Sequence, residues 1–388
     1  MAIQLLNINI KTGETKPVNN ILKGSTKLLT AGMFCAASLV PMLSQATENT
    51  LHIYNWSDYI AEDTIEKFEK KTGIKVVYDM FDSYGAVEAK LLVGNSGYDL
   101  VMFDASLSPR LIEAKIFQPL DKTKLSGWPN LDPDVLQQLK GYDPQLSYSM
   151  PYTWGTVGFT YNVDMIEERM PNAPVDSMAM LLDPEVVAKF ADCGVTVVDL
   201  ASDMVPIALT YLGLDPNSNK KSDIKAAEKL FKGVLPHIKK FDSTGYLNDL
   251  PAKENCLSMT WSGDYAVATM RAEEAGADVN LKYTIPKEGA PIWFDALYVP
   301  SDAKNVDAAH QFMNFLLQPD IIADVTNYTG YANANVKSLA LVDPSISEDV
   351  GIYPDKNTMQ RLFSKNPKSN KEVRQLTKAW GRIKSGRE

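Results

Sequence analysis

Histidine is scarce in this chain, and the side-chain patterns on which most enzymes depend are missing. The 388 residues include three histidines, His52, His237 and His310, whose spacing is not that of a metal-binding motif. There is no Gly-rich phosphate-binding loop, nucleophile elbow or Cys-x-x-Cys motif. These absences predict a protein without a metal, a cofactor or a catalytic reaction. The enzymatic alternative is a pair of carboxylates acting on a sugar, but nothing in the sequence would separate their pKa values.

Positive charge is also in short supply. Lys and Arg number 39 against 48 Asp and Glu, which gives a formal net charge of −9. Nucleic-acid binding requires clustered Lys and Arg, so this composition disfavours a nucleic-acid partner and mildly favours cationic ligands. With 45% hydrophobic residues, the chain is expected to fold into a soluble globular protein large enough for two lobes.

A long apolar run near the start of the chain is expected to be an export signal. Four lysines lie within residues 11–27, the apolar run covers residues 28–43, and small residues follow. This order predicts a secretory signal peptide over residues 1–46. The run is short for a membrane span, although a retained anchor is the alternative. Cleavage would remove four Lys and one Glu and change the net charge from −9 to −12.

Cysteine is rare as well, with three residues in the chain. Cys35 lies in the apolar run, which leaves Cys193 and Cys256 as an even pair in a chain expected to reach an oxidising compartment. We therefore predict a disulfide between them. Closing a loop of that length stabilises the fold by about 4 kcal/mol in the chain-entropy model. Two buried free thiols are the alternative.

Aromatic residues stand beside an acid at three separated places. The first contains Trp56 and Asp58, the second contains Trp261 and Asp264, and the third is a Trp-Phe-Asp sequence that ends at Asp295. A carboxylate shielded by rings is costly to desolvate unless a cation or hydrogen-bond donors satisfy it, and aromatic faces attract ammonium groups. Together these motifs predict one pocket for a flexible diamine or polyamine. The alternative is that each Trp belongs to the core and each Asp caps a helix.

The order of the predicted elements indicates an α/β fold. Three apolar strands within residues 51–103 alternate with helices that begin after Asp63, where Glu66 would complete a capping box, and after Ser83. Alternation of this kind builds an open, doubly wound parallel sheet. A final helix carries apolar residues on one face and basic residues on the other, which we interpret as a solvated face rather than a membrane-binding one.

In such a sheet, ligands bind beyond the carboxyl ends of the strands. Trp56 and Ser57 end the first strand, and Asp104 and Ser106 follow the third. Both groups are therefore expected at one edge of the ligand crevice, although Asp104 could equally be a solvated helix cap. Asp295 lies inside a later apolar strand and needs a partner there, because buried polar groups are hydrogen-bonded.

The chain is expected to cross between two lobes about three times, so that the lobes are interleaved around a hinge. We expect the N-terminal lobe to comprise residues 50–153 and 287–335, and the C-terminal lobe residues 154–286 and 336–388. A monomer is the expected state for a fold of this kind.

Six short motifs occur in a specific order along the mature chain. They are Asn-Trp-Ser-Asp-Tyr at 55–59, Tyr-Asp-Leu-Val at 98–101, Trp-Ser-Gly-Asp at 261–264, Ile-Pro-Lys-Glu-Gly at 285–289, Phe-Asp at 294–295 and Tyr-Ala-Asn-Ala-Asn at 331–335. The chain thereby resembles the periplasmic putrescine-binding and spermidine-binding proteins of ABC-type polyamine importers. The resemblance implies a two-lobed type II periplasmic binding fold that closes on its ligand and presents it to an inner-membrane permease.

Carried over position by position, the resemblance assigns roles to individual residues. It makes Asp58, Asp264 and Asp295 the amine-binding acids, with Ser57 as a polar neighbour, and it places Asp203 where the family often has a Glu that contacts an amine. The walls of the ligand box would be Trp56, Tyr59, Trp261, Trp293 and Tyr331. The two cysteines outside the signal peptide match a pair of the putrescine-type branch. The Ser-Asp pair at 57–58 is also typical of that branch, which favours the shorter diamine.

Three residues depart from the family pattern. Asp104 stands where the family usually has Ser, Trp293 is the bulkier, spermidine-like choice, and Lys365 falls near a position that can contact the distal end of the ligand. If Asp104 faces the pocket, its charge should favour a longer or more highly charged cation; if Lys365 reaches in, it would pair with Asp104 or disfavour a distal amine. Spermidine or an acylated diamine is therefore the alternative ligand. A polyamine sensor that docks on a membrane signalling protein is the alternative function.

Overall fold

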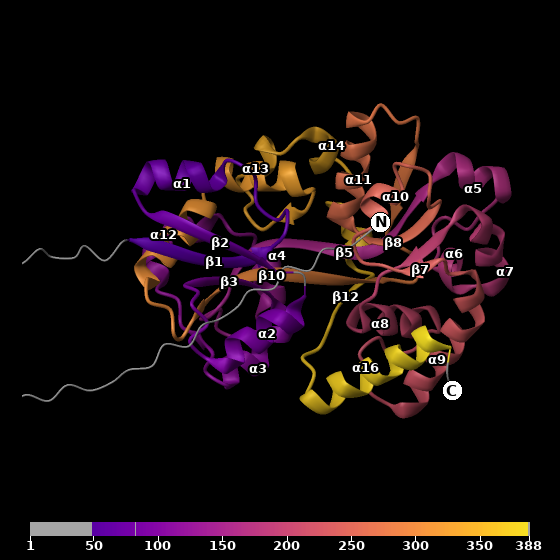
Figure 1. The fold of residues 1–388 in the computed structure, drawn as a ribbon, viewed down its shortest axis with the longest axis horizontal. Coiled ribbons are helices and arrows are strands. Elements are labelled where there is room, and N and C mark those ends of the chain that lie inside the picture. The colour runs from indigo at the N-terminus through magenta and orange to yellow at the C-terminus, as the bar shows by residue number, and fades with distance from the viewer. Residues whose placement is uncertain (1–48, 82, 387–388) are drawn as a thin grey trace, which may run out of the picture. The chain divides into compact units, whose positions relative to one another are not determined.

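The computed structural model describes residues 49–81 and 83–386, all of which belong to one compact unit of the chain (Figure 1). The predicted signal peptide, residues 1–46, lies outside the described residues.

Twelve strands form one sheet, and eight of them follow each other across it in the order β2-β1-β3-β10-β5-β8-β6-β7. These eight are β1 (Thr50–Trp56), β2 (Lys75–Phe81), β3 (Leu100–Asp104), β5 (Met150–Asn162), β6 (Val195–Val197), β7 (Lys240–Phe241), β8 (Leu257–Trp261) and β10 (Ala290–Pro300). Four short strands pair beside this path: β4 (Phe117–Gln118), β9 (Leu281–Thr284), β11 (Ala332–Asn333) and β12 (Leu362–Ser364).

The sheet is mixed, and the parallel order predicted from residues 51–103 holds only in part of it. The first strands agree with this prediction, because β1 pairs in parallel with both β2 and β3. However, β10 runs antiparallel to both β3 and β5, and β5 runs antiparallel to β8. The first part of β5 pairs with β10 and its last part pairs with β8 and β9. Two long strands that connect both halves of the sheet therefore interrupt the parallel order.

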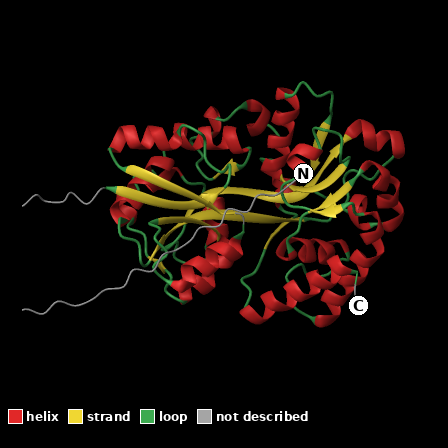
Figure 2. Cartoon of the chain, viewed as in Figure 1, coloured by secondary structure: helices red, strands yellow, loops and turns green. Residues whose placement is uncertain are grey.

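Helices lie on both sides of the strands (Figure 2). They are α1 (Thr64–Thr72), α2 (Tyr84–Val93), α3 (Ser108–Glu113), α4 (Pro133–Leu139), α5 (Val163–Arg169), α6 (Ala179–Leu182), α7 (Pro184–Val187), α8 (Ala201–Tyr211), α9 (Lys221–Val234), α10 (Tyr246–Asp249), α11 (Ser262–Glu274), α12 (Val306–Leu316), α13 (Pro319–Thr329), α14 (Pro344–Ser347), α15 (Lys356–Met359) and α16 (Asn370–Ser385). Short 3₁₀ turns between these elements include η1 (Ala105–Leu107), η2 (Lys122–Lys124) and η4 (Ala188–Cys193).

The helix starts were predicted with mixed success. Ser83 caps α2 by accepting a hydrogen bond from the Ala86 backbone N–H, as predicted. Asp63 precedes α1 but makes no side-chain cap, so the predicted capping box is wrong there. Its backbone is already helical at φ −95° and ψ −2°, and its carboxylate instead pairs with Lys67 one turn later at 2.9 Å. A helical backbone turns the side chain away from the orphan amides, which need an extended cap residue.

The predicted disulfide is present between Cys193, at the end of η4, and Cys256, just before β8. The C-terminal helix α16 also has the predicted amphipathic character. Trp380 packs edge-to-face between Phe231 of α9 and Phe241 of β7, and its indole N–H donates to Asp199. The last helix thereby packs against α9 and the short strand β7.

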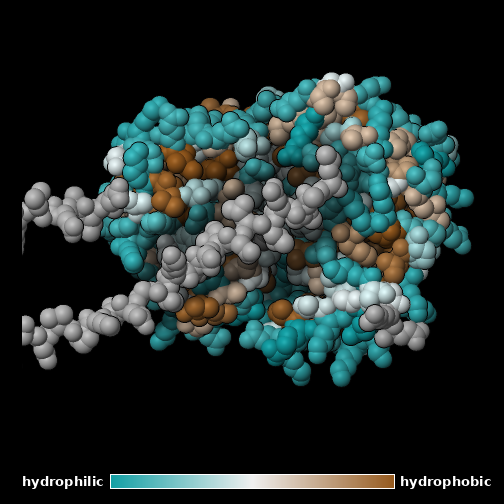
Figure 3. Space-filling view, viewed as in Figure 1, coloured by the Kyte–Doolittle hydropathy of each residue, from teal (hydrophilic) through white to brown (hydrophobic). Residues whose placement is uncertain are grey.

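Hydrophilic residues predominate on the face shown in Figure 3, and hydrophobic ones gather there in separate patches. None of the helices within residues 49–81 and 83–386 is both long and apolar enough to cross a bilayer. In the same residues, no group of three or more His, Cys, Asp or Glu is arranged to hold a metal ion.

Candidate functional site

Asp295 is the centre of a buried hydrogen-bonded cluster. It lies in β10, directly opposite Asp104 of β3 on one side and Thr153 of β5 on the other. The Tyr84 hydroxyl donates to Asp295 Oδ1 at 2.8 Å, and the Tyr59 hydroxyl donates to Oδ2 at 3.0 Å. With Asp295 only 2% exposed, these phenols are the partners that a buried acid requires.

The electrostatic setting of Asp295 is unusual for an acid. Burial, reinforced by the Asp104 carboxylate, raises the pKa of Asp295 to about 7, although the two phenol donors and Lys365 oppose that shift. No ion pair joins Asp295 to another described residue. An approaching ammonium group would therefore stabilise its ionised form strongly, because an opposite charge within a few ångströms lowers the pKa of a carboxyl group.

Asp264 is held in a similar way at the start of α11. β8 ends at Trp261, α11 begins at the next residue, and Asp264 lies in the first turn, where the helix dipole favours a negative charge. The hydroxyls of Tyr246 and Tyr331 donate to its two carboxylate oxygens. Burial raises the pKa of Asp264, and the two phenol donors oppose the shift.

An aromatic wall connects these two acids. The Tyr331 ring packs edge-to-face on Trp293, with 5.1 Å between ring centroids, and on Tyr59, with 5.5 Å. Because Tyr331 donates to Asp264 and Tyr59 donates to Asp295, the two carboxylates lie at opposite ends of one row of rings.

Two glycines make room for that wall. A Cβ atom at Gly263 would lie 2.4 Å from carbons of the Tyr331 ring, and one at Gly155 would lie 2.7 Å from Trp293 Cζ2. Any larger residue would displace the rings. The Trp293 side chain is buried, and its indole N–H has no hydrogen-bond acceptor among the described residues.

Two further buried acids, Asp104 and Asp203, share the ammonium group of one lysine, Lys365. Lys365 Nζ donates to Asp203 Oδ1 at 2.8 Å and lies 3.5 Å from Asp104 Oδ2. All three residues are buried. Asp104 also accepts hydrogen bonds through Oδ1 from the backbone N–H and the hydroxyl of Ser106, so it caps η1 and contacts the lysine at the same time. Burial alone would lower the pKa of Lys365, but the attraction of Asp104 and Asp203 outweighs it and raises the pKa.

The structure separates the other predicted residues from this cluster to different degrees. Trp56 is partly buried and packs on Tyr84, with 4.9 Å between ring centroids. Trp261 is also partly buried. Ser57 and Asp58 are exposed, and Asp58 adopts a left-handed φ of 53°, which Asp tolerates better than most residues. Hydrogen bonds and ring contacts join Trp56, through Tyr84, to the predicted residues Tyr59, Asp264, Trp293, Asp295 and Tyr331. A second group, Asp104, Ser106 and Asp203, is joined through Lys365 and the Asp104 cap.

Sequence reasoning placed Tyr59 and Tyr331 in the site but missed Tyr84 and Tyr246, the other two tyrosines that hold the acids. Tyr84 follows the correctly predicted cap Ser83, so its position just beyond the carboxyl end of a parallel strand could have been inferred. Tyr246 lies in the short helix α10, and nothing in its local sequence signals contact with Asp264. Thr153, which shares a 2.7 Å hydrogen bond with Tyr59, was passed over as a strand residue.

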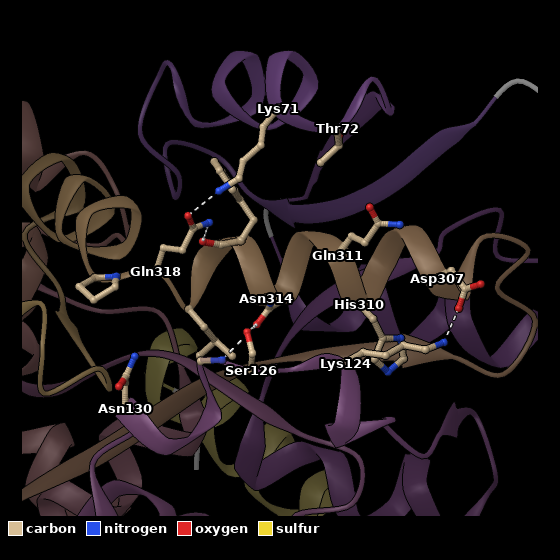
Figure 4. Close-up of a pocket in the computed structure, with 14 residues that line it drawn as sticks. Lys71, Thr72, Lys124, Ser126, Asn130, Asp307, His310, Gln311, Asn314 and Gln318 are labelled. Carbon is tan, nitrogen blue, oxygen red and sulfur yellow. Dashed lines mark hydrogen bonds and ion pairs between the residues drawn. The ribbon is translucent and has the colours of Figure 1, made fainter.

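A cavity of about 720 Å³ lies elsewhere, between the end of α1, η2 and α12 (Figure 4). Its charged groups already have partners: Lys124 pairs with Asp307, and Lys71 donates to Gln318 at 2.6 Å. None of the buried carboxylates described above lines it. The acid and tyrosine cluster, rather than this cavity, is therefore the candidate site.

Comparison with known proteins gives a consistent result. Residues 63–354 match the family of bacterial extracellular solute-binding proteins. The chain is 45% identical to the putrescine-binding periplasmic protein PotF of Escherichia coli K12 over 361 residues, which cover 92% of this chain and 97% of the relative. It is 43% identical to the putrescine-binding periplasmic protein SpuD of Pseudomonas aeruginosa UCBPP-PA14 over 353 residues, 91% of this chain and 96% of the relative.

A solved structure, the spermidine/putrescine ABC transporter substrate-binding protein PotD from Streptococcus pneumoniae, superposes with a TM-score of 0.74. It is 27% identical, and the match covers 88% of this chain and all of that one. The predicted two-lobed type II periplasmic binding fold is thereby confirmed.

Proposed function

Because the chain belongs to the bacterial extracellular solute-binding proteins, which bind solutes and are not enzymes, we propose that it is exported to the periplasm and captures putrescine or a related polyamine there. It would then deliver the ligand to the inner-membrane permease of an ABC importer. The relatives named above are periplasmic putrescine-binding proteins, which supports both the compartment and the ligand class.

The observation that carries the proposal is the pair Asp264 and Asp295. Both acids are held by tyrosine hydroxyls, neither has a cationic partner within ion-pair distance among the described residues, and a row of aromatic rings separates them. A diamine matches this arrangement, since each end can neutralise one carboxylate and its methylenes can pack on the rings.

Closure of the two lobes would be the working motion. We assign Asp295 to the N-terminal lobe, residues 50–153 and 287–335, and Asp264 to the C-terminal lobe, residues 154–286 and 336–388. A ligand that contacts acids of both lobes stabilises the closed state over the open one. Asp58 would join from the rim, where its exposed carboxylate attracts the cation. The protein would act as a monomer.

An acylated diamine is a second candidate ligand. The observation in its favour is the buried Trp293 indole N–H, which has no acceptor among the described residues and could donate to an acyl oxygen. Putrescine has no hydrogen-bond acceptor when both of its amines are protonated, so only the acylated ligand could accept a hydrogen bond from this indole N–H.

Calorimetric titration of the refolded, ligand-stripped mature protein tests the proposal. The protein is refolded because a tight ligand can survive purification and mask the site. Putrescine, cadaverine, spermidine, agmatine and N-acetylputrescine would then be titrated separately. We expect putrescine to bind at a 1:1 ratio and more tightly than the others. Preference for N-acetylputrescine would support the second candidate, and no heat from any of the five would overturn the ligand class.

A further inference from the structure

A lysine side chain of the protein occupies the position between the buried acids Asp104 and Asp203. We propose that Lys365 is a specificity-determining residue: its ammonium group fills this cation position, and so reserves the site for ligands with two ammonium groups. This inference rests on the proposed function and identifies the side chain by which the site would prefer diamines to triamines.

The geometry of Lys365 matches that of a bound amine. Its Nζ lies 2.8 Å from Asp203 Oδ1 and 3.5 Å from Asp104 Oδ2, and the residue is 6% exposed. The backbone is fixed as well, because the Tyr142 hydroxyl donates to the Lys365 carbonyl at 2.8 Å. Lys365 directly follows β12, which pairs in parallel with β10, the strand that carries Asp295. A rigid attachment of this kind holds the cation in place.

The lysine belongs to the same electrostatic cluster as the ligand acids. Asp104 and Asp295 are directly paired between β3 and β10, and both Asp104 and Lys365 act on the ionisation of Asp295. A third ligand ammonium would find the position between Asp104 and Asp203 already occupied by the Lys365 ammonium group. It would lose both carboxylates as hydrogen-bond partners there, and at close range it would be repelled by the lysine, because water screens buried charges little.

The same contacts argue against a ligand carboxylate at this end. Lys365 is held by two carboxylates, so a third anion would meet Asp104 and Asp203 before it could reach the ammonium group. The lysine therefore acts as a substitute for a ligand amine rather than as a receptor for an acid.

Lys365→Met is the direct test, since methionine keeps most of the volume and removes the charge. The ratio of spermidine affinity to putrescine affinity would be measured by calorimetry for the parent and the variant. We expect this ratio to rise by about tenfold or more, which corresponds to about 1.4 kcal/mol. Lys365→Arg keeps the positive charge and is the matched control, and its ratio should stay close to that of the parent.

The charge origin of the effect has its own readout. In Lys365→Met the freed carboxylates attract a third ammonium group, whereas in Lys365→Arg a cation of the chain still occupies the position between them. A gain for spermidine that appears equally in Lys365→Arg would overturn the proposal and indicate a change of space alone.

Loss of Lys365 leaves two buried acids uncompensated, which can prevent folding. The comparison is therefore repeated in an Asp104→Ser background, where only Asp203 is left without a cation. There the Lys365→Met substitution should again raise the spermidine to putrescine ratio. If putrescine binds the parent and the ratio does not change in either background, this inference fails while the proposed function stands. If the parent binds neither polyamine, the proposed function itself fails.

Discussion

Asp264 and Asp295 are held by tyrosines rather than by basic side chains. A phenol satisfies a carboxylate oxygen without neutralising its charge, so each acid, once ionised, carries a negative charge that no side chain balances. Asp104 and Asp203 differ, because they share the ammonium group of Lys365, which offsets one of their two negative charges. This contrast between acids of one cluster divides the site into positions for a ligand and a position that the chain fills itself.

The raised pKa of Asp295 predicts a pH dependence of stability. Its pKa of about 7 in the folded protein lies above the usual value of about 4, so the folded state binds this proton more tightly than the unfolded chain. The contribution of Asp295 to the free energy of unfolding of the ligand-free protein should therefore fall between about pH 4 and pH 7, by up to about 4 kcal/mol. Urea unfolding of the parent and of Asp295→Asn at several pH values measures this contribution as the difference between their free energies of unfolding. A constant difference across this range would contradict the prediction.

Putrescine binding should depend on pH in the opposite direction. The ligand requires ionised Asp295, so the affinity should rise with pH up to about 7, by at most about tenfold per unit from this group. Burial also raises the pKa of Asp264, so its ionisation acts on binding in the same direction. Calorimetry at pH 5.5, 6.5 and 7.5 would show the trend, and an affinity that falls over this range would exclude the assigned role.

Asp264→Asn should weaken putrescine binding by about 30-fold or more. The amide cannot balance an ammonium group, and loss of one partner of a buried charged hydrogen bond costs about 2–5 kcal/mol. Asp58→Asn is the control at the exposed rim, where screening by water should limit the loss to less than tenfold. Equal losses in the two variants would show that the ligand lies at the rim instead.

At the scale of elements, the sequence identified the individual strands and helices better than their pairing. The apolar runs that form β3 and β10 were recognised, as was the cap at Ser83, because each depends on residues close in sequence. The antiparallel direction of β10 depends on where the chain returns to the sheet, between β3 and β5, and no local pattern records this. The Asp63 cap failed for a local reason: its backbone is already helical, and its side chain pairs with Lys67 one turn later.

The start of α11 offers a test of how an element shapes the site. Gly263→Ala would place a methyl group 2.4 Å from the Tyr331 ring, so the ring should move and loosen its hydrogen bond to Asp264. We expect weaker putrescine binding together with lower stability, measured by calorimetry and urea unfolding. Gly381→Ala in α16 is the control, because nothing lies within 4 Å of its added methyl group. The control should stabilise by about 0.4–1 kcal/mol and leave binding unchanged; normal binding in Gly263→Ala would mean that Tyr331 does not position Asp264.

At the scale of the whole molecule, the Cys193–Cys256 disulfide contributes to stability and not to the site. It closes a loop with a sequence separation of 63 residues, which in the chain-entropy model stabilises by about 4 kcal/mol. A double Cys→Ser variant should lose about that free energy of unfolding and keep its putrescine affinity at temperatures where it is folded. A variant of unchanged stability would contradict this assignment.

Much of the whole-molecule description could be predicted because the motifs occur in a specific order over most of the chain. Two of the tyrosine partners of the acids could not, because Tyr246 lies 18 residues from Asp264, and Tyr84 lies 211 residues from Asp295. Such contacts arise only when distant segments meet. The pairing of Lys365 with Asp203 is of the same kind, with 162 residues between them.

A crystal structure of the putrescine complex tests the central claim most directly. The account predicts one ligand nitrogen within hydrogen-bond distance of the Asp264 carboxylate and the other within hydrogen-bond distance of Asp295, with the methylenes against Tyr331 and Trp293 and with Lys365 still between Asp104 and Asp203. Putrescine bound at Asp58 alone, in the cavity beside α12, or in place of the Lys365 ammonium group would contradict it.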